Sequence, residues 1–477
     1  MKHSNIILTQ RVFDIFGQIC DIPHSSENMG GISRYCRNFA INHNFRYVKD
    51  DAENVIIFKP GTAGYENSEP VILQGHLDMV CQKTEDCTIN FDEHGIETFV
   101  DGDFLKAKNT TLGGDNGIAV AMILAILESD DIPHPPIEAV FTTDEEIGMV
   151  GARKMDMNIL SAKRMINLDS EEDDTVTVSC AGGSDLKIYA PLNAQPKNGT
   201  KAIVILRGLL GGHSGVEIHK NRVNANILAG EFLNSLKTDF DVISINGGDK
   251  SNAIPNLCKI ELLVENSDDF SAEALKILEN LKKKYTNEPD FSYSVELCGK
   301  TASLVISEQT KNNILHTLAN VPDGVIEMSK DIDGLVETST NLGILKTEDD
   351  RLSLHFALRS NKTDGLCELE KVLISFFDKI NWESDASGHY PPWEFNPGSV
   401  LREIYKEAYF DFYKKQPKVE AIHAGLECGV FASQIENFDC IAIGPSLYDV
   451  HTVNERLSIS STKNTFNLLL KILEKLK

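Results

Sequence analysis

The first third of the chain alternates short apolar runs with one long apolar segment. Residues 55–58 (VIIF), 71–74 (VILQ) and 137–143 (IEAVFTT) are short runs typical of buried strands. Residues 118–127 (IAVAMILAIL) are apolar on almost every side, which indicates a buried helix. This alternation predicts an α/β fold, with a mixed sheet flanked by helices.

A different pattern begins near residue 185, where amphipathic strands alternate with amphipathic helices and predict an α+β domain. The strands are expected at 203–207, 259–264 and 352–358, and the helices around 222–236, 271–285 and 365–380. The α/β pattern returns after 390–393 (YPPW). Since 477 residues exceed the usual size of one core, we predict a catalytic domain of 1–184 and 387–477, interrupted by a large lid domain at 185–386.

Charge, hydropathy and cysteine spacing restrict where the protein works and what it binds. The formal net charge of -25 makes nucleic acid and anionic membrane surfaces poor partners. The apolar run at residues 6–8 is too short for a secretory leader, and no stretch approaches the ~20 apolar residues of a transmembrane helix. The ten cysteines contain no Cys-x-x-Cys pair, so we expect reduced structural thiols. A soluble cytoplasmic protein is therefore expected.

Six residues stand where predicted strands end or a helix begins, which is where open α/β sheets place ligands. Each alone has an ordinary explanation: a hydrogen-bonded structural histidine, a solvated Glu-Glu pair, or an aspartate that caps a helix. Together they instead indicate a metal site, because they follow the order His-x-Asp, Gly-Asp-Asn-Gly, Glu-Glu-x-Gly, strand-Asp and a late histidine. The six residues are His76, Asp115, Glu145, Glu146, Asp169 and His451.

Imidazole and carboxylate groups are suitable zinc ligands, and two zinc ions ~3.5–4 Å apart need a bridging group. We assign the bridge to Asp115, because a carboxylate offers one oxygen to each ion. His76 and Asp169 would complete one site. Glu146 and His451 would complete the other.

Two further carboxylates are expected to act beside the metals. Asp78 lies two positions after His76, so both side chains point the same way along an extended chain. Asp78 can therefore fix the tautomer of the imidazole. Glu145 is the candidate general base, since the neighbouring Glu146 would pin the segment that positions it.

These motifs resemble the dizinc aminoacylase and carboxypeptidase G clan, and more specifically the bacterial aminoacyl-histidine dipeptidases, also called cytosolic non-specific dipeptidases. The resemblance covers nearly the whole chain and is carried by 74–80 (QGHLDMV), 111–117 (TLGGDNG), 169–172 (DSEE), 211–215 (GGHSG) and 423–429 (HAGLECG). It implies a zinc-peptidase-like catalytic domain with a lid, and a cis peptide bond at Asp115–Asn116. It also implies two Zn²⁺ ions per chain, with Mn²⁺ or Co²⁺ as substitutes. The implied substrates are dipeptides such as β-alanyl-histidine. Before His451 the chain has 446–450 (SLYDV), where the family pattern has glycine and proline.

The resemblance also assigns roles within the lid. From spacing alone, 211–215 is a glycine-rich turn with an incidental histidine, whereas the resemblance implies that His213 stabilises the oxyanion of the tetrahedral intermediate. His219 is a nearby competitor for that role. Asn252 and Arg359 match substrate-contact positions.

Arg359 would hold the C-terminal carboxylate of the peptide, unless it is a surface arginine at a strand end. Glu427 could meet the free amine of the substrate or serve as a structural ion-pair partner. A lid of this length could hold two related halves, so that His213 serves its own chain. Supply of His213 across a homodimer stays open.

Three other functions are compatible with parts of the sequence. An amidohydrolase that deacylates N-acyl amino acids would use the same metals. A catalytically inactive zinc-binding protein would not need Glu145. A cysteine hydrolase using Cys428 and His423 would have to resist chelators.

Overall fold

The computed structural model describes residues 2–477 and divides them into two compact units. Unit 1 comprises the residues up to Cys180, together with Phe395–Ala421 and Leu426–Lys477, whereas unit 2 comprises Ala181–Glu394 and Ile422–Gly425. The predicted catalytic and lid domains have the same order, with boundaries at 184 and 386. Nothing in the sequence pattern indicates that 422–425 belong with unit 2. Met1, the start of the predicted catalytic domain, lies outside the described residues.

Unit 1 contains a mixed eight-stranded sheet, which confirms the predicted α/β class. Its central strands β6, β3, β7 and β21 are parallel, whereas the pairs β1–β2, β2–β6 and β21–β8 are antiparallel. In spatial order the strands are β1 (Arg46–Lys49), β2 (Val55–Lys59), β6 (Ile137–Thr142), β3 (Val71–His76), β7 (Arg164–Asn167), β21 (Asp439–Ala442), β8 (Thr175–Cys180) and β20 (Lys418–Ile422).

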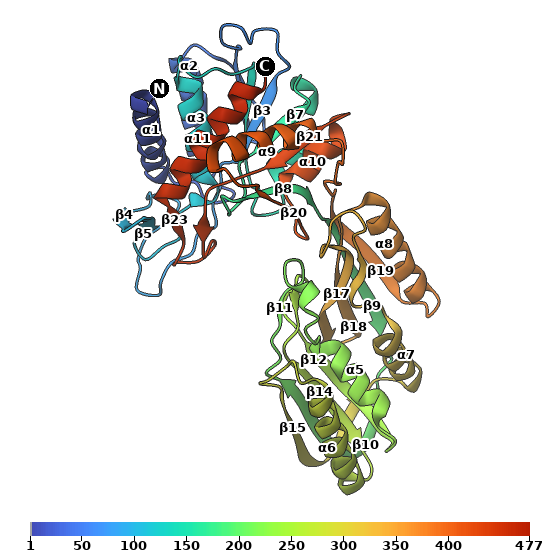
Figure 1. The fold of residues 1–477 in the computed structure, drawn as a ribbon. Coiled ribbons are helices and arrows are strands. Elements are labelled where there is room, and N and C mark those ends of the chain that lie inside the picture. The colour runs from blue at the N-terminus through green and yellow to red at the C-terminus, as the bar shows by residue number, and fades with distance from the viewer. Residues whose placement is uncertain (1) are drawn as a thin grey trace. The chain divides into compact units, whose positions relative to one another are not determined.

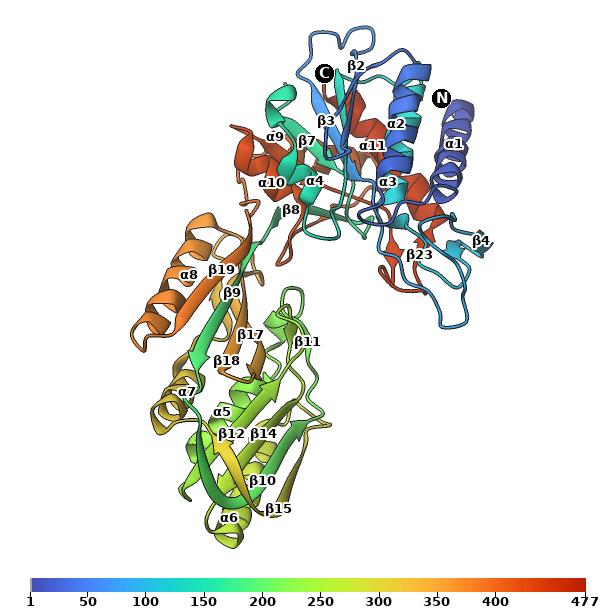
Figure 2. The same cartoon turned by 180° about the vertical axis from the view of Figure 1, so that it is seen from behind.

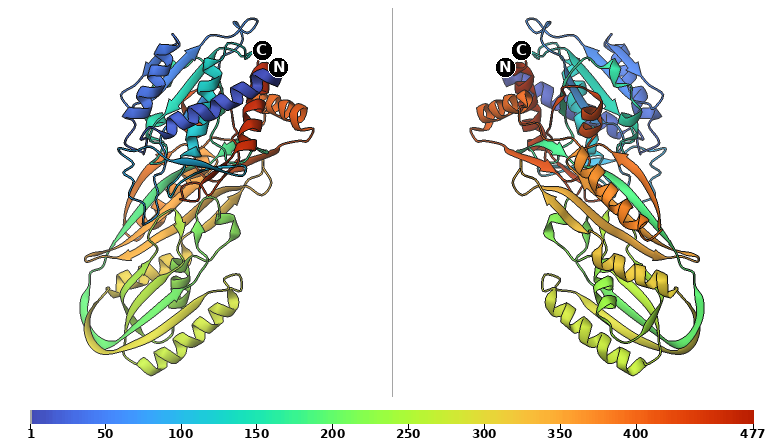
Figure 3. Two further views of the ribbon diagram at one scale, coloured as in Figure 1. Left: turned by 90° about the vertical axis from the view of Figure 1, so that its left-hand side faces the viewer. Right: turned by 90° about the vertical axis from the view of Figure 1, so that its right-hand side faces the viewer.

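Helices cover both faces of this sheet, as Figure 3 shows. On one face α3 packs on β3 and α1 packs on α3, while α2 packs on β1 and β2 from the other face. The predicted buried helix at 118–127 is confirmed, because every residue in that stretch is at most 1% exposed. The helices are α1 (Lys2–Cys20), α2 (Gly30–Asn42), α3 (Gly114–Glu128), α4 (Val150–Lys154), α9 (Val400–Tyr413), α10 (Glu427–Gln434) and α11 (Ile459–Lys475), with a 3₁₀ turn at Met157–Ile159.

A second, four-stranded sheet in unit 1 was not predicted. Its order is β22 (Leu447–Tyr448), β23 (Arg456–Ser458), β5 (Phe104–Ala107) and β4 (Thr98–Asp101). The loop between β22 and β23 carries His451. Of the helices that the structure describes, none is long and apolar enough to cross a membrane.

Unit 2 is an α+β domain whose helices lie on one face of a nine-stranded sheet (Figures 1 and 2). All six elements predicted there are present. The strands are β9 (Gly182–Pro191), β10 (Gln195–Arg207), β12 (Phe240–Gly247), β14 (Cys258–Val264), β15 (Ser292–Val305), β16 (Gly324–Met328), β17 (Val336–Thr347), β18 (Arg351–Ser360) and β19 (Glu383–Tyr390). The helices are α5 (Ala225–Ser235), α6 (Ser267–Lys284), α7 (Glu308–Asn320) and α8 (Thr363–Asp378), with a 3₁₀ turn at Ile218–Lys220. A short ladder pairs β11 (Gly212–His213) with β13 (Ala253–Ile254).

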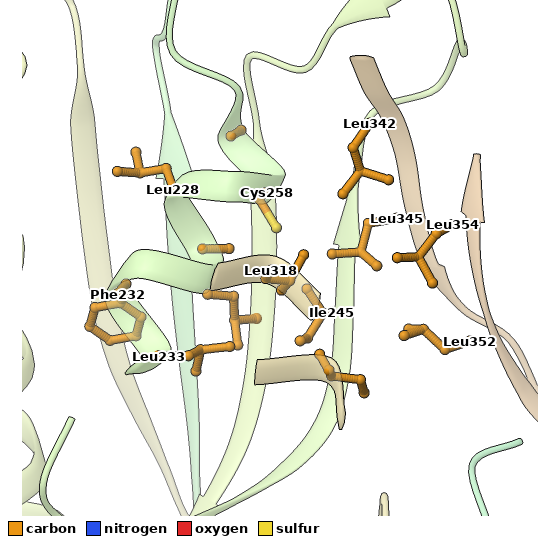
Figure 4. Close-up of a cluster of buried hydrophobic side chains, with 14 of the residues drawn as sticks. Leu228, Phe232, Leu233, Ile245, Cys258, Leu318, Leu342, Leu345, Leu352 and Leu354 are labelled. Atoms are coloured by element: carbon orange, nitrogen blue, oxygen red, sulfur yellow. The ribbon is translucent and has the colours of Figure 1, made fainter. Parts of the chain in front are cut away.

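The large sheet of unit 2 consists of two blocks, β15-β10-β14-β12 and β17-β18-β9-β19, joined by a pairing of only two residues on β12 with two on β17. One hydrophobic core nevertheless spans both blocks. Figure 4 shows Phe232 of α5 and Ile245 of β12 with Leu345 of β17 and Leu354 of β18. This shared core stabilises the two blocks as one unit.

Candidate active site

The adjacent strands β6, β3 and β7 bring predicted ligands to one edge of the sheet in unit 1. His76 is the last residue of β3, Glu146 follows β6 and Asp169 follows β7. The carboxyl ends of parallel strands share one edge, so these side chains converge. Asp115 reaches the same place from the start of α3, and His451 from the β22–β23 loop.

Asp115 lies between the two histidines. Its Oδ1 is 3.0 Å from Nε2 of His76, and its Oδ2 is 3.1 Å from Nε2 of His451. Asp169 Oδ1 is 3.5 Å from His76 Nε2, whereas Glu146 Oε1 is 2.8 Å from His451 Nε2. The five side chains therefore form two groups that share Asp115.

His76, Asp115 and Glu146 also present ligand atoms within 4.8 Å of one another and could hold a metal ion. The Asp115–Asn116 peptide bond is cis, as the resemblance implies.

Crowding of charge perturbs the titration of these groups. Burial raises the pKa of Asp169 to about 6, and the neighbouring Asp115 and Glu146 add to the rise. For Asp115, burial is outweighed by hydrogen bonds with His451 and His76, which hold its pKa well below the usual value. Hydrogen bonds to Asp115 and Glu146 raise the pKa of His451 to about 11. Three carboxylates that crowd two imidazoles in this way favour the binding of cations.

Asp78 connects His76 to the Glu-Glu segment. Its side chain is buried, and its Oδ1 lies 3.4 Å from Nδ1 of His76, whose nearest acceptor is the Asp78 carbonyl oxygen at 3.0 Å. With Nδ1 donating to Asp78, Nε2 is the nitrogen that faces Asp115. The carboxylate also accepts hydrogen bonds from Ser26 Oγ (2.8 Å) and from the backbone N–H groups of Glu145 (2.9 Å) and Glu146 (3.2 Å).

Glu145 is half-buried beside the ligand cluster. Burial raises the pKa of its carboxyl well above the usual value; His76 opposes the rise, whereas Asp169, Glu427 and Glu146 add to it. A carboxylate with a raised pKa is a better proton acceptor, which suits a general base.

Glu427 lies in a polar layer beneath the ligands. It is fully buried, and its Oε2 accepts hydrogen bonds from Gln74 Nε2 (2.5 Å) and Thr142 Oγ1 (2.7 Å). Burial raises its pKa to about 7. Asn167 extends the layer, because its Nδ2 donates to Gln74 Oε1 (2.6 Å) and its Oδ1 accepts from the backbone N–H of Asp169 (3.2 Å).

Gln74, Thr142 and Asn167 were missed by the sequence analysis. Gln74 and Asn167 each stand two positions before a predicted ligand and directly after buried apolar residues of β3 and β7. That spacing places them on the same side of the strand as the ligand. It is the signal that could have identified them.

His213, in unit 2, has its ring fixed by its own loop. Its Nδ1 accepts hydrogen bonds from the backbone N–H groups of Gly215 (3.1 Å) and Val216 (3.2 Å). Burial lowers its pKa, and the charge of Arg359 lowers it further. A neutral ring whose Nδ1 accepts carries its proton on Nε2. At position 215, a Cβ would lie 2.9 Å from His213 Cε1, so the loop needs glycine there.

Arg359 and Asn252 line one cavity of unit 2, with a volume of about 530 Å³. Arg359 is 9% exposed, its Nη1 donates to Tyr390 Oη (2.8 Å), and its buried Nε has no hydrogen-bond partner among the residues that the structure describes. Asn252 is exposed, and its carbonyl accepts from the backbone N–H of Ser214, next to His213. His219, the alternative to His213, is exposed on a 3₁₀ turn.

The structure gives Cys428 and His423 surroundings unlike those of a nucleophile and its base. Burial raises the pKa of the Cys428 thiol well above its usual value. His423 is buried and hydrogen-bonded to Ser339 Oγ (2.7 Å) and Asn361 Oδ1 (3.0 Å). A reactive cysteine needs a lowered pKa, so this pair does not favour a cysteine hydrolase.

Comparison with known proteins gives matches over the whole chain. The profile of peptidase family M20/M25/M40 matches residues 72–475. The chain is 34% identical to the cytosol non-specific dipeptidase of Escherichia coli over 483 residues, covering 100% of this chain and 99% of that protein.

Among solved structures, the aminoacylhistidine dipeptidase of Vibrio alginolyticus matches with a TM-score of 0.90 and 34% identity, over 98% of this chain and 96% of that one. The aminopeptidase PepT of Bacillus cereus shares the fold at a TM-score of 0.56 and 14% identity, over 98% of both chains.

Proposed function

We propose a substrate and a mechanism on the premise that the chain belongs to peptidase family M20/M25/M40 and therefore hydrolyses peptide bonds. The proposed enzyme is a cytoplasmic dizinc dipeptidase that cleaves unblocked dipeptides, including Xaa-His substrates such as β-alanyl-histidine. The observation that carries the proposal is the position of Asp115, whose two oxygens face different histidines. The two dipeptidases matched over almost their full lengths support the substrate class.

The donor set fits two divalent cations. His76 and Asp169 would hold one ion, Glu146 and His451 the other, and Asp115 both. Three carboxylate charges against two divalent ions leave one positive charge, which favours deprotonation of a nearby water. Two zinc ions would supply Lewis acidity toward the peptide carbonyl and the attacking water, and manganese or cobalt suits the same oxygen-rich ligands.

Glu145 is proposed as the general base. It would take the proton from the attacking water and deliver it to the leaving amine. Its burial and its place beside the ligand cluster support this role. Asp78 would hold the base by accepting the hydrogen bond from its backbone N–H, and would keep the His76 ring in the tautomer that presents Nε2 to the metal.

His213 is proposed to stabilise the oxyanion. Because two backbone N–H groups occupy Nδ1, the neutral ring carries its proton on Nε2, which can donate to the oxyanion. Arg359 is proposed to bind the C-terminal carboxylate of the dipeptide, supported by its unpartnered Nε and by the cavity that it shares with Asn252. Asn252 would contact the substrate beside it.

Glu427 is fully buried and its Oε2 accepts from two neutral side chains, which favours a structural role, whereas its Oε1 has no hydrogen-bond partner among the described residues. We propose that it organises the polar layer under His76 and Asp169.

The proposal is tested by hydrolysis of β-alanyl-histidine, alanyl-alanine and an N-acetyl amino acid. Wild type is compared with Glu145→Ala at matched metal content, and with Asp144→Asn as the neighbouring control. We expect cleavage of the free dipeptides, and a loss of at least ~100-fold in Glu145→Ala with both metals retained. Cleavage of the N-acetyl amino acid alone would instead identify an amidohydrolase. Full activity of Glu145→Ala would contradict the assignment of the base.

A further inference from the structure

Glu455 accepts hydrogen bonds from four consecutive backbone N–H groups. Its Oε2 accepts from Leu112 (2.7 Å) and Gly113 (3.1 Å), and its Oε1 accepts from Gly114 (2.8 Å) and Asp115 (3.4 Å). Glu455 is only 3% exposed. A row of N–H groups of this kind is a strong site for an anion, and here the chain fills it with its own carboxylate.

These N–H groups belong to the segment that leads into the regular part of α3, so they lie outside its ladder of hydrogen bonds. The N-cap residue is Gly113, in the left-handed conformation (φ 71°), and no side chain from that position caps the helix. Asp115 (φ -84°, ψ 105°) and Asn116 (φ -116°, ψ 24°) are not helical, so the regular helix begins after them. Glu455 therefore anchors the irregular backbone from which the carboxylate of Asp115 faces His76 and His451.

Glu455 also ends the loop that carries His451. Its own N–H donates to the carbonyl oxygen of Thr452 (3.1 Å), and the next residue, Arg456, begins β23 and pairs with β5. One side chain therefore joins the loop with His451 to the loop with Asp115. The two ligand side chains meet at 3.1 Å.

The close approach depends on a glycine. A Cβ at position 114 would lie 3.2 Å from Oε1 of Glu455 and 2.8 Å from Cδ2 of Leu447. Gly114 thus leaves room for the carboxylate above the backbone.

From this geometry we infer that Glu455 is a positioning residue of the metal centre, which anchors the backbone of Asp115 and fixes the His451 loop beside it. The inference rests on the proposed function only in taking Asp115 and His451 as metal ligands. Groups that orient metal ligands typically change metal affinity by about 10- to 100-fold when they are replaced.

Zinc titration of the metal-free protein, in competition with a chromophoric chelator, tests this role in wild type, Glu455→Gln and Glu138→Gln. Glutamine keeps the shape of the side chain but turns an NH₂ group toward N–H donors. Glu138 is the matched control, because it is 5% exposed and accepts from Ser161 N (3.0 Å), Ser161 Oγ (2.6 Å) and Ala162 N (3.1 Å) in a loop without predicted ligands.

We expect Glu455→Gln to weaken zinc binding by about 10- to 100-fold, and Glu138→Gln to change it by less than about twofold. Excess zinc should restore part of the activity of Glu455→Gln. If Glu455 only stabilised the fold, both Glu455→Gln and Glu138→Gln would have a lower melting temperature without metal, and the zinc affinity would be unchanged.

Wild-type affinity in Glu455→Gln would therefore overturn the inference. If that variant does not fold, Glu455→Asp is titrated in its place, and wild-type affinity or failure to fold in this second variant overturns the inference as well. A wild type that binds no zinc would contradict the proposed function itself. Two tightly bound ions in both wild type and variant would contradict only the role of Glu455.

Discussion

The backbone N–H of Glu145 donates a hydrogen bond of 2.9 Å to Oδ1 of Asp78. The same carboxylate accepts from the N–H of Glu146 and lies beside Nδ1 of His76. One side chain thus orients a predicted ligand, the backbone of a second ligand, and the proposed base. The role expected from the sequence, fixing the imidazole tautomer, is only part of what this contact allows.

Replacing Asp78 by asparagine should therefore damage catalysis more than metal binding. The side-chain NH₂ group of the variant would face one of the two backbone N–H donors and could not accept a hydrogen bond from it. The Glu145–Glu146 segment would then lose one of the hydrogen bonds that hold it. We expect kcat for alanyl-alanine to fall by about 10- to 100-fold with two metals still bound. Ser26→Ala removes a single hydrogen bond from Asp78, and should reduce kcat by less than about tenfold. Wild-type kcat in Asp78→Asn would contradict this prediction.

The central strands of the sheet in unit 1 could be predicted because they are short, buried and mostly apolar. β3 and β6 are buried throughout, and their parallel pairing sends the polar residues that follow them to one edge. For that reason the convergence of His76, Glu146 and Asp169 could be expected from sequence order alone. Their roles as metal ligands stay predictions.

The positions of Asp115 and His451 could not be predicted in the same way. Asp115 stands before a helix, where capping is the ordinary expectation, but its backbone is non-helical and is held by the distant Glu455. His451 depends on a hairpin whose first strand has two residues. Such short elements are set by tertiary contacts, which local propensity does not contain.

His213→Ala should lower kcat by about 100- to 1000-fold, because it removes one donor to the oxyanion. His219→Ala is the matched control, since His219 is an exposed histidine six positions later, and its kcat should stay at the wild-type value. Gly215→Ala should resemble His213→Ala in part, because the new methyl group would clash with the carbonyl oxygen of His423 (2.7 Å) and with the ring of His213 (2.9 Å). If His219→Ala causes the larger loss, the role belongs to His219.

Arg359→Ala should raise KM by about 10- to 100-fold with a smaller effect on kcat, since the carboxylate is bound equally in the ground and transition states. Arg351→Ala, on the same strand but exposed and paired with Glu348 at 2.6 Å, should leave KM unchanged. A dipeptide amide lacks the carboxylate, so Arg359→Ala should change the KM for the amide no more than Arg351→Ala does. An unchanged KM for the free dipeptide in Arg359→Ala would contradict this role.

Removal of metal should abolish activity and lower the melting temperature. Without cations, Asp115, Glu146 and Asp169 are held together with only histidines to offset their charge. We expect dipicolinate treatment to inactivate the enzyme, and Zn²⁺, Mn²⁺ or Co²⁺ to restore it. Glu145→Ala should take up the same two ions and remain inactive. Full activity after verified metal removal would contradict the metal mechanism and favour the thiol of Cys428.

Acidification should destabilise the protein in part through His423. Burial, assisted by the charge of Arg359, lowers the pKa of His423 to about 3 in the folded chain, compared with about 6.5 when unfolded. Below pH 6.5 the unfolded chain therefore binds a proton that the folded chain does not. The stability contributed by the neutral ring is complete above about pH 6.5 and is lost progressively as the pH falls toward about 3.

For one such group the free energy of unfolding falls by about 1.4 kcal/mol per pH unit in this window, or about 2 kcal/mol between pH 6.5 and 5. Denaturant unfolding of wild type and His423→Gln at pH 7.5 and 5 measures that difference. The variant is less stable at pH 7.5, because its contacts with Ser339 and Asn361 change, but it should lose about 2 kcal/mol less on acidification. His316→Gln, at an exposed position of α7, should respond to pH as the wild type does. Equal acid sensitivity in wild type and His423→Gln would mean that His423 is already protonated in the folded protein.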